Sequence, residues 1–190
     1  MRKNIVLDID GVIADFEGYF CKQFGDEHRE KVKLEERYPE YSKGISLFTQ
    51  SIVTYNNLQP LALGVKIAQY LDSQKEFDIC LVSSRPTYCL ESTNYWMKKN
   101  QIPYMTLSCG NDKIKRIMKL DPLFAIEDMG EEAIKMRYLG IPVILISQPY
   151  NKKYEADFPR ISEFWMFLRQ FEKILDSSKY EVLARMIKHE

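Results

Sequence analysis

Short apolar runs of strand length alternate along this chain with longer segments of helical periodicity. The runs occupy residues 4–9, 77–83, 123–127 and 142–146, with a weaker one at 104–107. The helical segments lie around 63–71, 90–99, 113–120, 133–139 and 163–175. Strands that are apolar at nearly every position are buried on both faces. The alternation therefore predicts an α/β fold with a central parallel sheet flanked by helices.

Residues 16–57 interrupt this alternation. They are rich in aromatic and charged side chains, and their pattern is helical. We interpret them as a small helical cap inserted over the strand ends after the first strand, so that the core comprises residues 1–15 and 58–190. The aromatic residues assigned to the cap's own core are Tyr19, Phe20, Phe24, Phe48 and Tyr55. At the other end of the chain, residues 178–190 are either a short final helix or a tail.

Composition narrows the classes of partner. The chain has 27 Lys and Arg against 27 Asp and Glu, and this balance disfavours binding to polymeric nucleic acid or an anionic membrane through bulk positive charge. The four cysteines form no CxxC pair, which disfavours a zinc cluster or a disulfide framework. Aspartates break the apolar start of the chain, which disfavours a signal peptide, and no apolar run reaches the roughly 18 residues of a membrane span. We expect a cytoplasmic protein.

Two aspartates follow the first predicted strand. Asp8 and Asp10 flank Ile9, and Gly11 comes directly after them. At a strand end with a glycine turn, two such carboxylates can converge on one pocket, where they share a metal or divide nucleophilic and proton-transfer roles. A solvated acidic turn explains the same pattern equally well, so the pair alone does not decide between the two interpretations.

Polar residues at the ends of two further predicted strands and at the start of a predicted helix favour the pocket over the solvated turn. Ser83 and Ser84 end the second strand, Lys113 opens a helix, and Glu127 and Asp128 end the 123–127 strand. Each has a simpler explanation as a cap or a solvated side chain. Together, however, they bring acids, hydroxyls and a lysine to the carboxyl edge of one parallel sheet, where ligands bind. Oxygen ligands of this kind predict a Mg²⁺ and phosphate site.

In this order the residues resemble the four motifs of the haloacid dehalogenase superfamily of phosphatases. The motifs are LDIDGV, LVSS, Lys113 and IED, and the resemblance covers residues 4 to about 147. It implies a Rossmann-like core. The opening LDIDGVIADFEGYF is similar to that of the pyrimidine 5′(3′)-deoxyribonucleotidases, and NLQPLALGV, PYN and RISEFW fit the wider nucleotidase-like group.

The resemblance implies a role for each motif residue. Asp8 is the nucleophile that forms an aspartyl-phosphate, and Asp10 is the general acid and then the general base. Mg²⁺ is held by the Asp8 carboxylate, the Asp10 backbone carbonyl and Asp128. The phosphate-binding residues are Ser83, Ser84 and Lys113. Glu127 is expected to act behind the metal ligands.

Some positions depart from the family pattern or extend it. Ser83 replaces the commoner threonine, and Glu127 stands where a second aspartate is common. Arg85 follows at a position where some deoxyribonucleotidases have no arginine, which makes it a candidate substrate contact. Phe16 matches a position near the nucleobase, where a ring can stack a base; a buried aromatic that joins core and cap is the alternative.

The leading hypothesis is a Mg²⁺-dependent phosphomonoesterase that acts on nucleoside monophosphates, in particular deoxyribonucleoside monophosphates. The alternatives are a phosphatase acting on a sugar phosphate or another small phosphoester, a 3′-phosphatase acting on nucleic acid ends, and a receiver-type signalling domain. Neutral charge disfavours the nucleic acid substrate. Asp10 disfavours the receiver, because a proton carrier two residues after the nucleophile hastens loss of a phosphoryl group that a switch must retain. The predicted partner is therefore a small phosphorylated substrate, with no polymeric nucleic acid and no membrane.

Overall fold

The computed structural model describes residues 2–25 and 42–187. Its centre is a sheet of six strands in the order β3-β2-β1-β4-β5-β6, and every neighbouring pair is parallel. The strands are β1 (Lys3–Leu7), β2 (Phe77–Ser83), β3 (Thr106–Cys109), β4 (Phe124–Glu127), β5 (Val143–Ile146) and β6 (Arg160–Ile161). The predicted α/β fold with a central parallel sheet is therefore confirmed.

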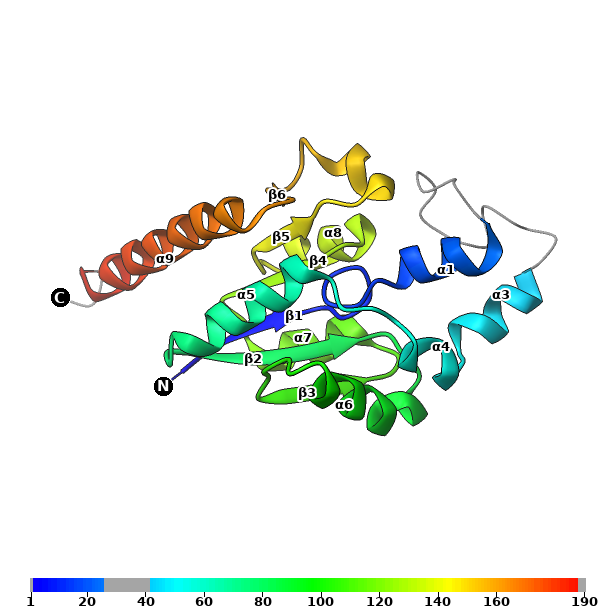
Figure 1. Ribbon diagram of the computed structural model, residues 1–190. Helices are drawn as coiled ribbons and strands as arrows, with labels where there is room; N and C mark the ends of the chain where they lie inside the picture. Colours follow the sequence, from blue (N-terminus) through cyan, green and yellow to red (C-terminus); the bar gives the residue numbers. More distant parts are fainter. Residues whose placement is uncertain (1, 26–41, 188–190) are drawn as a thin grey trace.

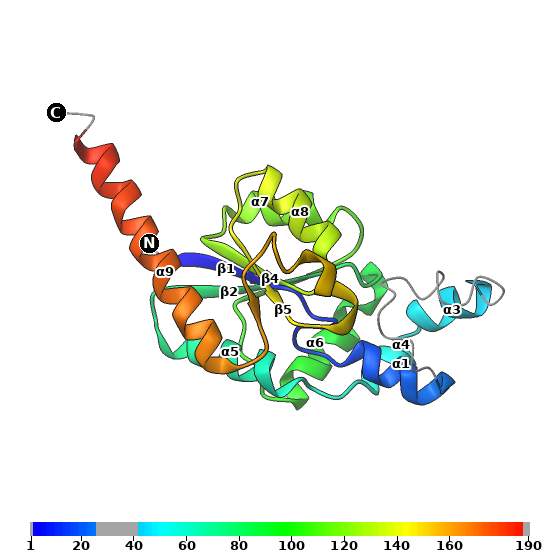
Figure 2. The same cartoon turned by 90° about the horizontal axis from the view of Figure 1, so that it is seen from above.

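Helices cover both faces of this sheet. They are α5 (Ala62–Ser73), α6 (Leu90–Lys99), α7 (Lys113–Leu120), α8 (Gly130–Tyr138) and α9 (Phe164–Ile187), with 3-10 turns η2 (Thr87–Cys89) and η3 (Pro149–Tyr154). Figure 2 shows α7 and α8 on one side of the sheet and α5 and α6 on the other. Alternate strand residues supply the two cores: Ile5 and Leu7 pack with α5, α6 and α9, whereas Val6 packs with α7 and α8.

Three further helices lie beyond the carboxyl ends of the central strands: α1 (Phe16–Phe24), α3 (Ser42–Thr49) and α4 (Ile52–Asn56). We call them the cap helices. Their aromatic side chains pack together, since Phe20 stacks on Phe24 with ring centroids 4.6 Å apart and meets Phe48 edge to face at 5.6 Å. Part of the predicted cap, residues 26–41, lies outside the described residues. The division into cap and core stays a prediction.

The structure corrects three details of the predicted elements. The edge strand β3 runs from Thr106 to Cys109 and so begins two residues later than the apolar run at 104–107. The last strand, β6, was not predicted at all. The segment after residue 178 is not a separate helix, because α9 continues without a break to Ile187 and extends away from the sheet (Figure 1).

The order of the strands by itself predicts where a ligand would bind. From β1 the chain proceeds to β2 and β3 on one side and to β4, β5 and β6 on the other. In open parallel sheets ligands bind at the carboxyl ends of the strands, where the order reverses in this way. The loops after β1, β2 and β4 therefore meet at the expected position, directly under the cap helices (Figure 1).

Candidate active site

A tight turn after β1 carries both aspartates. The backbone N–H of Asp8 still donates to Ile126 of β4 at 3.0 Å, and the Ile9 carbonyl then accepts from Ile13 and Ala14, each at 2.8 Å. Gly11 has φ +79°, a conformation that favours glycine. A Cβ at Gly11 would lie 2.0 Å from Oδ2 of Asp128. Only glycine lets this turn approach the Asp128 carboxylate so closely.

Lys113 is buried between two carboxylates at the first residue of α7. Its Nζ lies 2.8 Å from Oδ1 of Asp8 and donates to Oε2 of Glu127 at 2.7 Å. Burial, reinforced by Glu127, raises the pKa of Asp8 to about 7. Burial acts to lower the pKa of Lys113, but Asp8 and Glu127 outweigh it and raise that pKa above its usual value. Lys113 therefore stays cationic.

Asp8, Glu127 and Asp128 form a buried acidic cluster. One carboxylate oxygen from each lies within 4.8 Å of the others. Burial raises the pKa of Glu127 and that of Asp128 to about 7. Asp128 accepts a hydrogen bond from the Tyr150 hydroxyl through Oδ2, whereas its buried Oδ1 accepts none from the described residues. Glu127 differs, because Lys113 bonds to its Oε2 and the N–H of Met129 donates to its Oε1 at 3.2 Å.

This donor set fits Mg²⁺. The ion prefers a few carboxylate oxygens and completes its shell with water and substrate. The unbonded Oδ1 of Asp128, close to the Asp8 carboxylate, is a ligand of that kind. Asp8 and Asp128 would hold the ion. Glu127 has both oxygens occupied by protein donors, so it is better placed to orient Lys113 than to bind metal. Its expected role behind the ligands stays a prediction.

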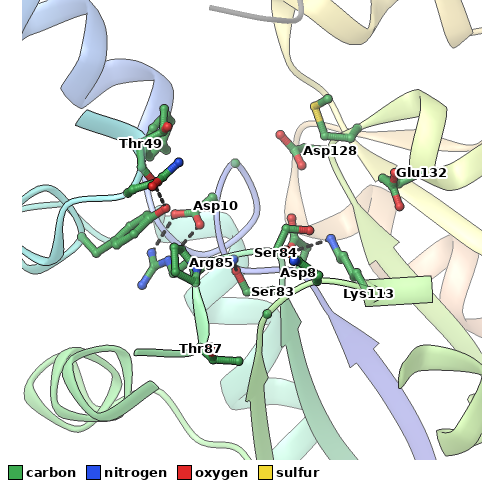
Figure 3. Close-up of a pocket in the computed structure, with 18 of the residues that line it drawn as sticks. Asp8, Asp10, Thr49, Ser83, Ser84, Arg85, Thr87, Lys113, Asp128 and Glu132 are labelled. Atoms are coloured by element: carbon green, nitrogen blue, oxygen red, sulfur yellow. Dashed lines mark hydrogen bonds and ion pairs between the residues drawn. The ribbon is translucent and has the colours of Figure 1, made fainter. Parts of the chain in front are cut away.

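The Asp10 carboxylate is paired with a different cation, Arg85. Arg85 donates from Nε to Oδ2 of Asp10 at 2.8 Å and from Nη2 to Oδ1 at 2.7 Å. Arg85 is only 2% exposed, whereas the Asp10 side chain is 25% exposed toward the cavity. Figure 3 shows Asp10 with Arg85 on one side and Asp8 with Lys113 on the other. The two aspartates that sequence places together are thus held separately, each by a different cation.

The end of β2 supplies hydroxyl groups to the same cavity. Ser83 is buried, and its Oγ accepts from the backbone N–H of Arg85 at 3.1 Å, which leaves the hydroxyl hydrogen free to donate. Arg116 fixes this strand end, since its Nη2 donates to the Ser83 carbonyl at 2.9 Å. Ser84 is exposed and lines the cavity between Arg85 and Lys113 (Figure 3).

A cavity of about 930 Å³ joins these groups to the cap helices. Every predicted site residue except Glu127 lines it: Asp8, Asp10, Phe16, Ser83, Ser84, Arg85, Lys113 and Asp128. Glu127 lies behind Lys113 and is 1% exposed. Phe16 lines the cavity and also packs against Phe48 and Tyr55, with ring centroids 6.0 and 6.3 Å away, so its contact with a nucleobase stays a prediction.

Several cavity residues were not singled out from the sequence. Tyr150 lies in η3, after β5, and belongs to the PYN motif noted above, although no site role was predicted for it. Thr49 and Gln50 come from the end of α3 and the turn after it, and no spacing pattern signals them, because their position depends on how the cap packs on the core. Tyr55, on α4, was assigned to the cap's own core and also lines the cavity. Glu132, on α8, likewise lines the cavity.

Comparison with known proteins gives a result at the level of structure only. No family model and no curated protein sequence matches the chain. A haloacid dehalogenase-like hydrolase from Streptococcus pneumoniae superposes with a TM-score of 0.63 at 14% identity, over 90% of this chain and 98% of the other. An L-2-haloacid dehalogenase gives 0.58 at 13% identity, over 90% and 100% of the two chains.

A structure with a bound sugar bisphosphate is also among the similar structures. CbbY from Rhodobacter sphaeroides, in complex with xylulose-1,5-bisphosphate, gives a TM-score of 0.57 at 13% identity, over 86% of this chain and 95% of the other. The fold is that of the haloacid dehalogenase-like hydrolases. At such low identity these proteins show the fold of this chain and not its substrate. None of the described helices is long and apolar enough to cross a membrane.

Proposed function

We propose that the chain is a Mg²⁺-dependent phosphomonoesterase that hydrolyses nucleoside monophosphates, in particular deoxyribonucleoside monophosphates, through an aspartyl-phosphate. The observation that carries this proposal is the separation of the two aspartates. Asp8 lies against Lys113 in the acidic cluster, while Arg85 holds Asp10 at the cavity wall. One carboxylate is thus placed for nucleophilic attack and the other for proton transfer, as a two-step phosphoryl transfer requires.

In the first step an Asp8 oxygen forms a bond to phosphorus as the ester P–O bond breaks. Asp10 gives a proton to the departing alkoxide. In the second step Asp10 takes a proton from water, the water oxygen bonds to phosphorus, and the acyl-phosphate bond to Asp8 breaks. Lys113 and the hydroxyl groups of Ser83 and Ser84 bind the non-bridging oxygens, which carry the charge of the loose transition state.

Asp8, Asp128 and the Asp10 backbone carbonyl would hold Mg²⁺. Bound there, the ion supplies the positive charge that lets a carboxylate approach a phosphate dianion. The fit of the site to a metal rests on the unbonded Oδ1 of Asp128 and on the closeness of the three acidic groups. Glu127 acts by holding Lys113 in place.

The cavity favours a substrate with a single phosphate and a flat, uncharged remainder. Among the described residues that line it, the cations are Arg85 and Lys113, and both are bound to carboxylates. A second phosphate would therefore have no partner there. Phe16 and Tyr55 line the cap side, and stacking of a base on an aromatic ring contributes about 1–3 kcal/mol. A volume of about 930 Å³ lies within the usual range for small-molecule sites.

Phosphate release from a panel of esters tests the proposal. The panel contains ribonucleoside and deoxyribonucleoside monophosphates, sugar phosphates and a 3′-phosphorylated oligonucleotide, each with Mg²⁺ and with EDTA. We expect Mg²⁺-dependent release with the highest kcat/KM on a nucleoside monophosphate. Preference for a sugar phosphate or for the oligonucleotide would overturn the substrate assignment and retain the phosphatase.

The variant Asp8→Asn tests the mechanism. It removes the nucleophile while preserving the size of the side chain, so turnover should fall to background. Asp157→Asn is the matched control, because Asp157 is an exposed aspartate outside the cavity, and it should retain full turnover. Turnover by the Asp8→Asn variant would overturn the covalent mechanism.

A further inference from the structure

Arg85 is bonded through every nitrogen of its guanidinium group. Nε and Nη2 donate to the two oxygens of Asp10, and Nη1 donates to Oγ1 of Thr93 at 3.1 Å. Thr93 is fully buried on α6. A bidentate pair of this kind fixes the plane of the carboxylate as well as its distance. Three of the five N–H donors of Arg85 are thus bonded, two of them to Asp10.

The ionic state of Arg85 agrees with this arrangement. Burial acts to lower its pKa, but the charge of Asp10 and the hydrogen bonds to it outweigh burial and raise that pKa above its usual value. A buried guanidinium is costly unless it is paired with an opposite charge, and Asp10 supplies that charge. Arg85 is therefore a permanent cation whose principal partner is the Asp10 carboxyl.

The cap helices contact the same guanidinium group. The ring of Tyr55, on α4, lies 4.3 Å from Cζ of Arg85, and the Tyr55 hydroxyl donates to the Thr49 carbonyl. Next to this contact, the Tyr88 hydroxyl donates to the Gln50 carbonyl at 2.6 Å. Arg85 is thus bonded to Asp10 and Thr93 of the core and contacts an aromatic ring of the cap. The position of Asp10 depends on both.

We propose that Arg85 is a positioning residue that directs the Asp10 carboxyl toward the leaving-group oxygen, and that Tyr55 links this orientation to the cap. The proposal rests on the function proposed above. Asp10 must reach the ester oxygen in the first step and a water molecule on the same side of phosphorus in the second. A carboxyl free to rotate on a surface turn would meet either atom only part of the time, and two fixed hydrogen bonds remove that freedom.

The test compares two esters that differ in their need for a proton. A nucleoside monophosphate, or the best alkyl ester from the panel, leaves as an alkoxide and requires one. p-Nitrophenyl phosphate leaves as a stabilised phenolate and does not. In Arg85→Met we expect kcat/KM for the alkyl ester, which reports the first step, to fall about 10²-fold, the lower end of what general acid catalysis contributes. For p-nitrophenyl phosphate kcat/KM should fall by a much smaller factor. Because Asp10 is also the general base of the second step, kcat is expected to fall with both esters.

Further variants separate positioning from general damage. Arg85→Lys retains the charge but not the fork, so it should show the same contrast between esters. Thr93→Val and Tyr55→Leu retain Arg85 but each removes one contact that fixes its side chain, so the difference between the two esters should be smaller. If Arg85→Met does not fold, these two variants test the proposal in its place. Arg85→Met added to Asp10→Asn should cause no further loss. Arg137→Met is the matched control, because Arg137 pairs with Asp157 at 3.5 Å and lies over Phe158 at 4.8 Å, outside the cavity.

Other outcomes overturn the proposal in distinguishable ways. An equal loss of kcat/KM with both esters would show that Arg85 binds the phosphate or supports the fold, and the phosphatase would stand without this role. If the wild-type protein releases phosphate from no ester, the proposed function fails and the role of Arg85 fails with it. Activity of Arg137→Met should equal that of wild type in every case.

Discussion

Nζ of Lys113 lies 2.8 Å from Oδ1 of Asp8, and the same atom also binds Glu127. One ammonium thus serves two buried carboxylates, while a third, Asp128, has no cation among the described residues and depends on a Tyr150 hydrogen bond. The ionised cluster carries two excess negative charges. A divalent cation would balance them, and protonation is the other way to remove them. We therefore expect the stability of this cluster to depend on pH and on a bound metal together.

Lys113→Met should abolish activity and destabilise the protein. Breaking a buried ion pair by removing one partner typically costs about 3–5 kcal/mol. At low pH the loss should be smaller, because the carboxyl groups left behind can bind protons instead. Urea unfolding in EDTA at pH 5 and at pH 8 measures the loss of stability at each pH. The control, Lys135→Met, removes a surface lysine paired with Glu132 at 2.6 Å and should cost under about 1 kcal/mol. A cost independent of pH would contradict the charge argument.

Metal-free wild-type protein should become less stable as pH rises from about 4 to about 7. The pKa values of Asp8, Glu127 and Asp128 lie near 7 in the folded chain, against ordinary values of 3.8 to 4.5. In that window the folded state binds more protons than the unfolded state, so raising the pH favours unfolding. The cluster is coupled, so its groups titrate as a set. Thermal unfolding in EDTA across this range measures the slope.

Added Mg²⁺ should reverse this loss, and more strongly at pH 7.5 than at pH 5, because protons compete with the metal for the same oxygens. At about 100 times Kd a ligand contributes about 2.7 kcal/mol, or about 5–10 °C in Tm for a chain of this size. Asp128→Asn should remove most of the Mg²⁺ effect. A Tm that does not respond to Mg²⁺ at pH 7.5 would contradict the metal assignment.

Tyr150→Phe should weaken Mg²⁺ binding while leaving the fold intact. Its hydroxyl donates to Oδ2 of Asp128 and so fixes the orientation of a carboxylate that belongs to the acidic cluster. Loss of such a supporting hydrogen bond typically lowers metal affinity about 10–100-fold. The Mg²⁺ concentration that gives half-maximal activity measures the change. Tyr138→Phe is the control, because Tyr138 is 84% exposed; equal Mg²⁺ dependence in the two variants would rule out the role of Tyr150.

The central strands could be predicted because burial on both faces makes them apolar at almost every position. The two edge strands, β3 and β6, could not be predicted in this way. β3 has the sequence TLSC and β6 has two residues, so neither displays a hydrophobic run that reports its position. Edge strands pack on fewer neighbours, and their register follows from the strands they join. This explains why the weak run at 104–107 gave a start two residues too early.

The candidate site, too, has a part that could be predicted from the sequence and a part that could not. Asp8 and Asp128 directly follow strands and Ser83 is the last residue of one, so topology alone brings them to one edge of the sheet. The pair of Asp10 and Arg85 has no such signal, because the two residues are 75 positions apart and meet only through the shapes of two loops. The sequence therefore predicts which residues gather at the site. It does not predict which cation holds which carboxylate, and the division of roles depends on that.

Gly64, in α5, should be intolerant of a side chain even though it lies in a helix, where glycine is usually unfavourable. A Cβ there would lie 1.9 Å from the carbonyl oxygen of Val12, in the turn that carries Asp8 and Asp10. Gly64→Ala must push α5 away from this turn, and overpacking of this kind typically costs about 1–3 kcal/mol. Activity should fall as well, because the displaced turn carries both aspartates.

Gly44→Ala is the matched control for this change. Gly44 also lies in a helix, α3, but a Cβ there would meet no heavy atom within 4 Å. Alanine should therefore stabilise the protein by about 0.5–1 kcal/mol without changing kcat. Urea unfolding and phosphate release, measured on both variants, give the comparison. If Gly64→Ala stabilised the protein as Gly44→Ala does, this would contradict the close packing of α5 against the Val12 carbonyl.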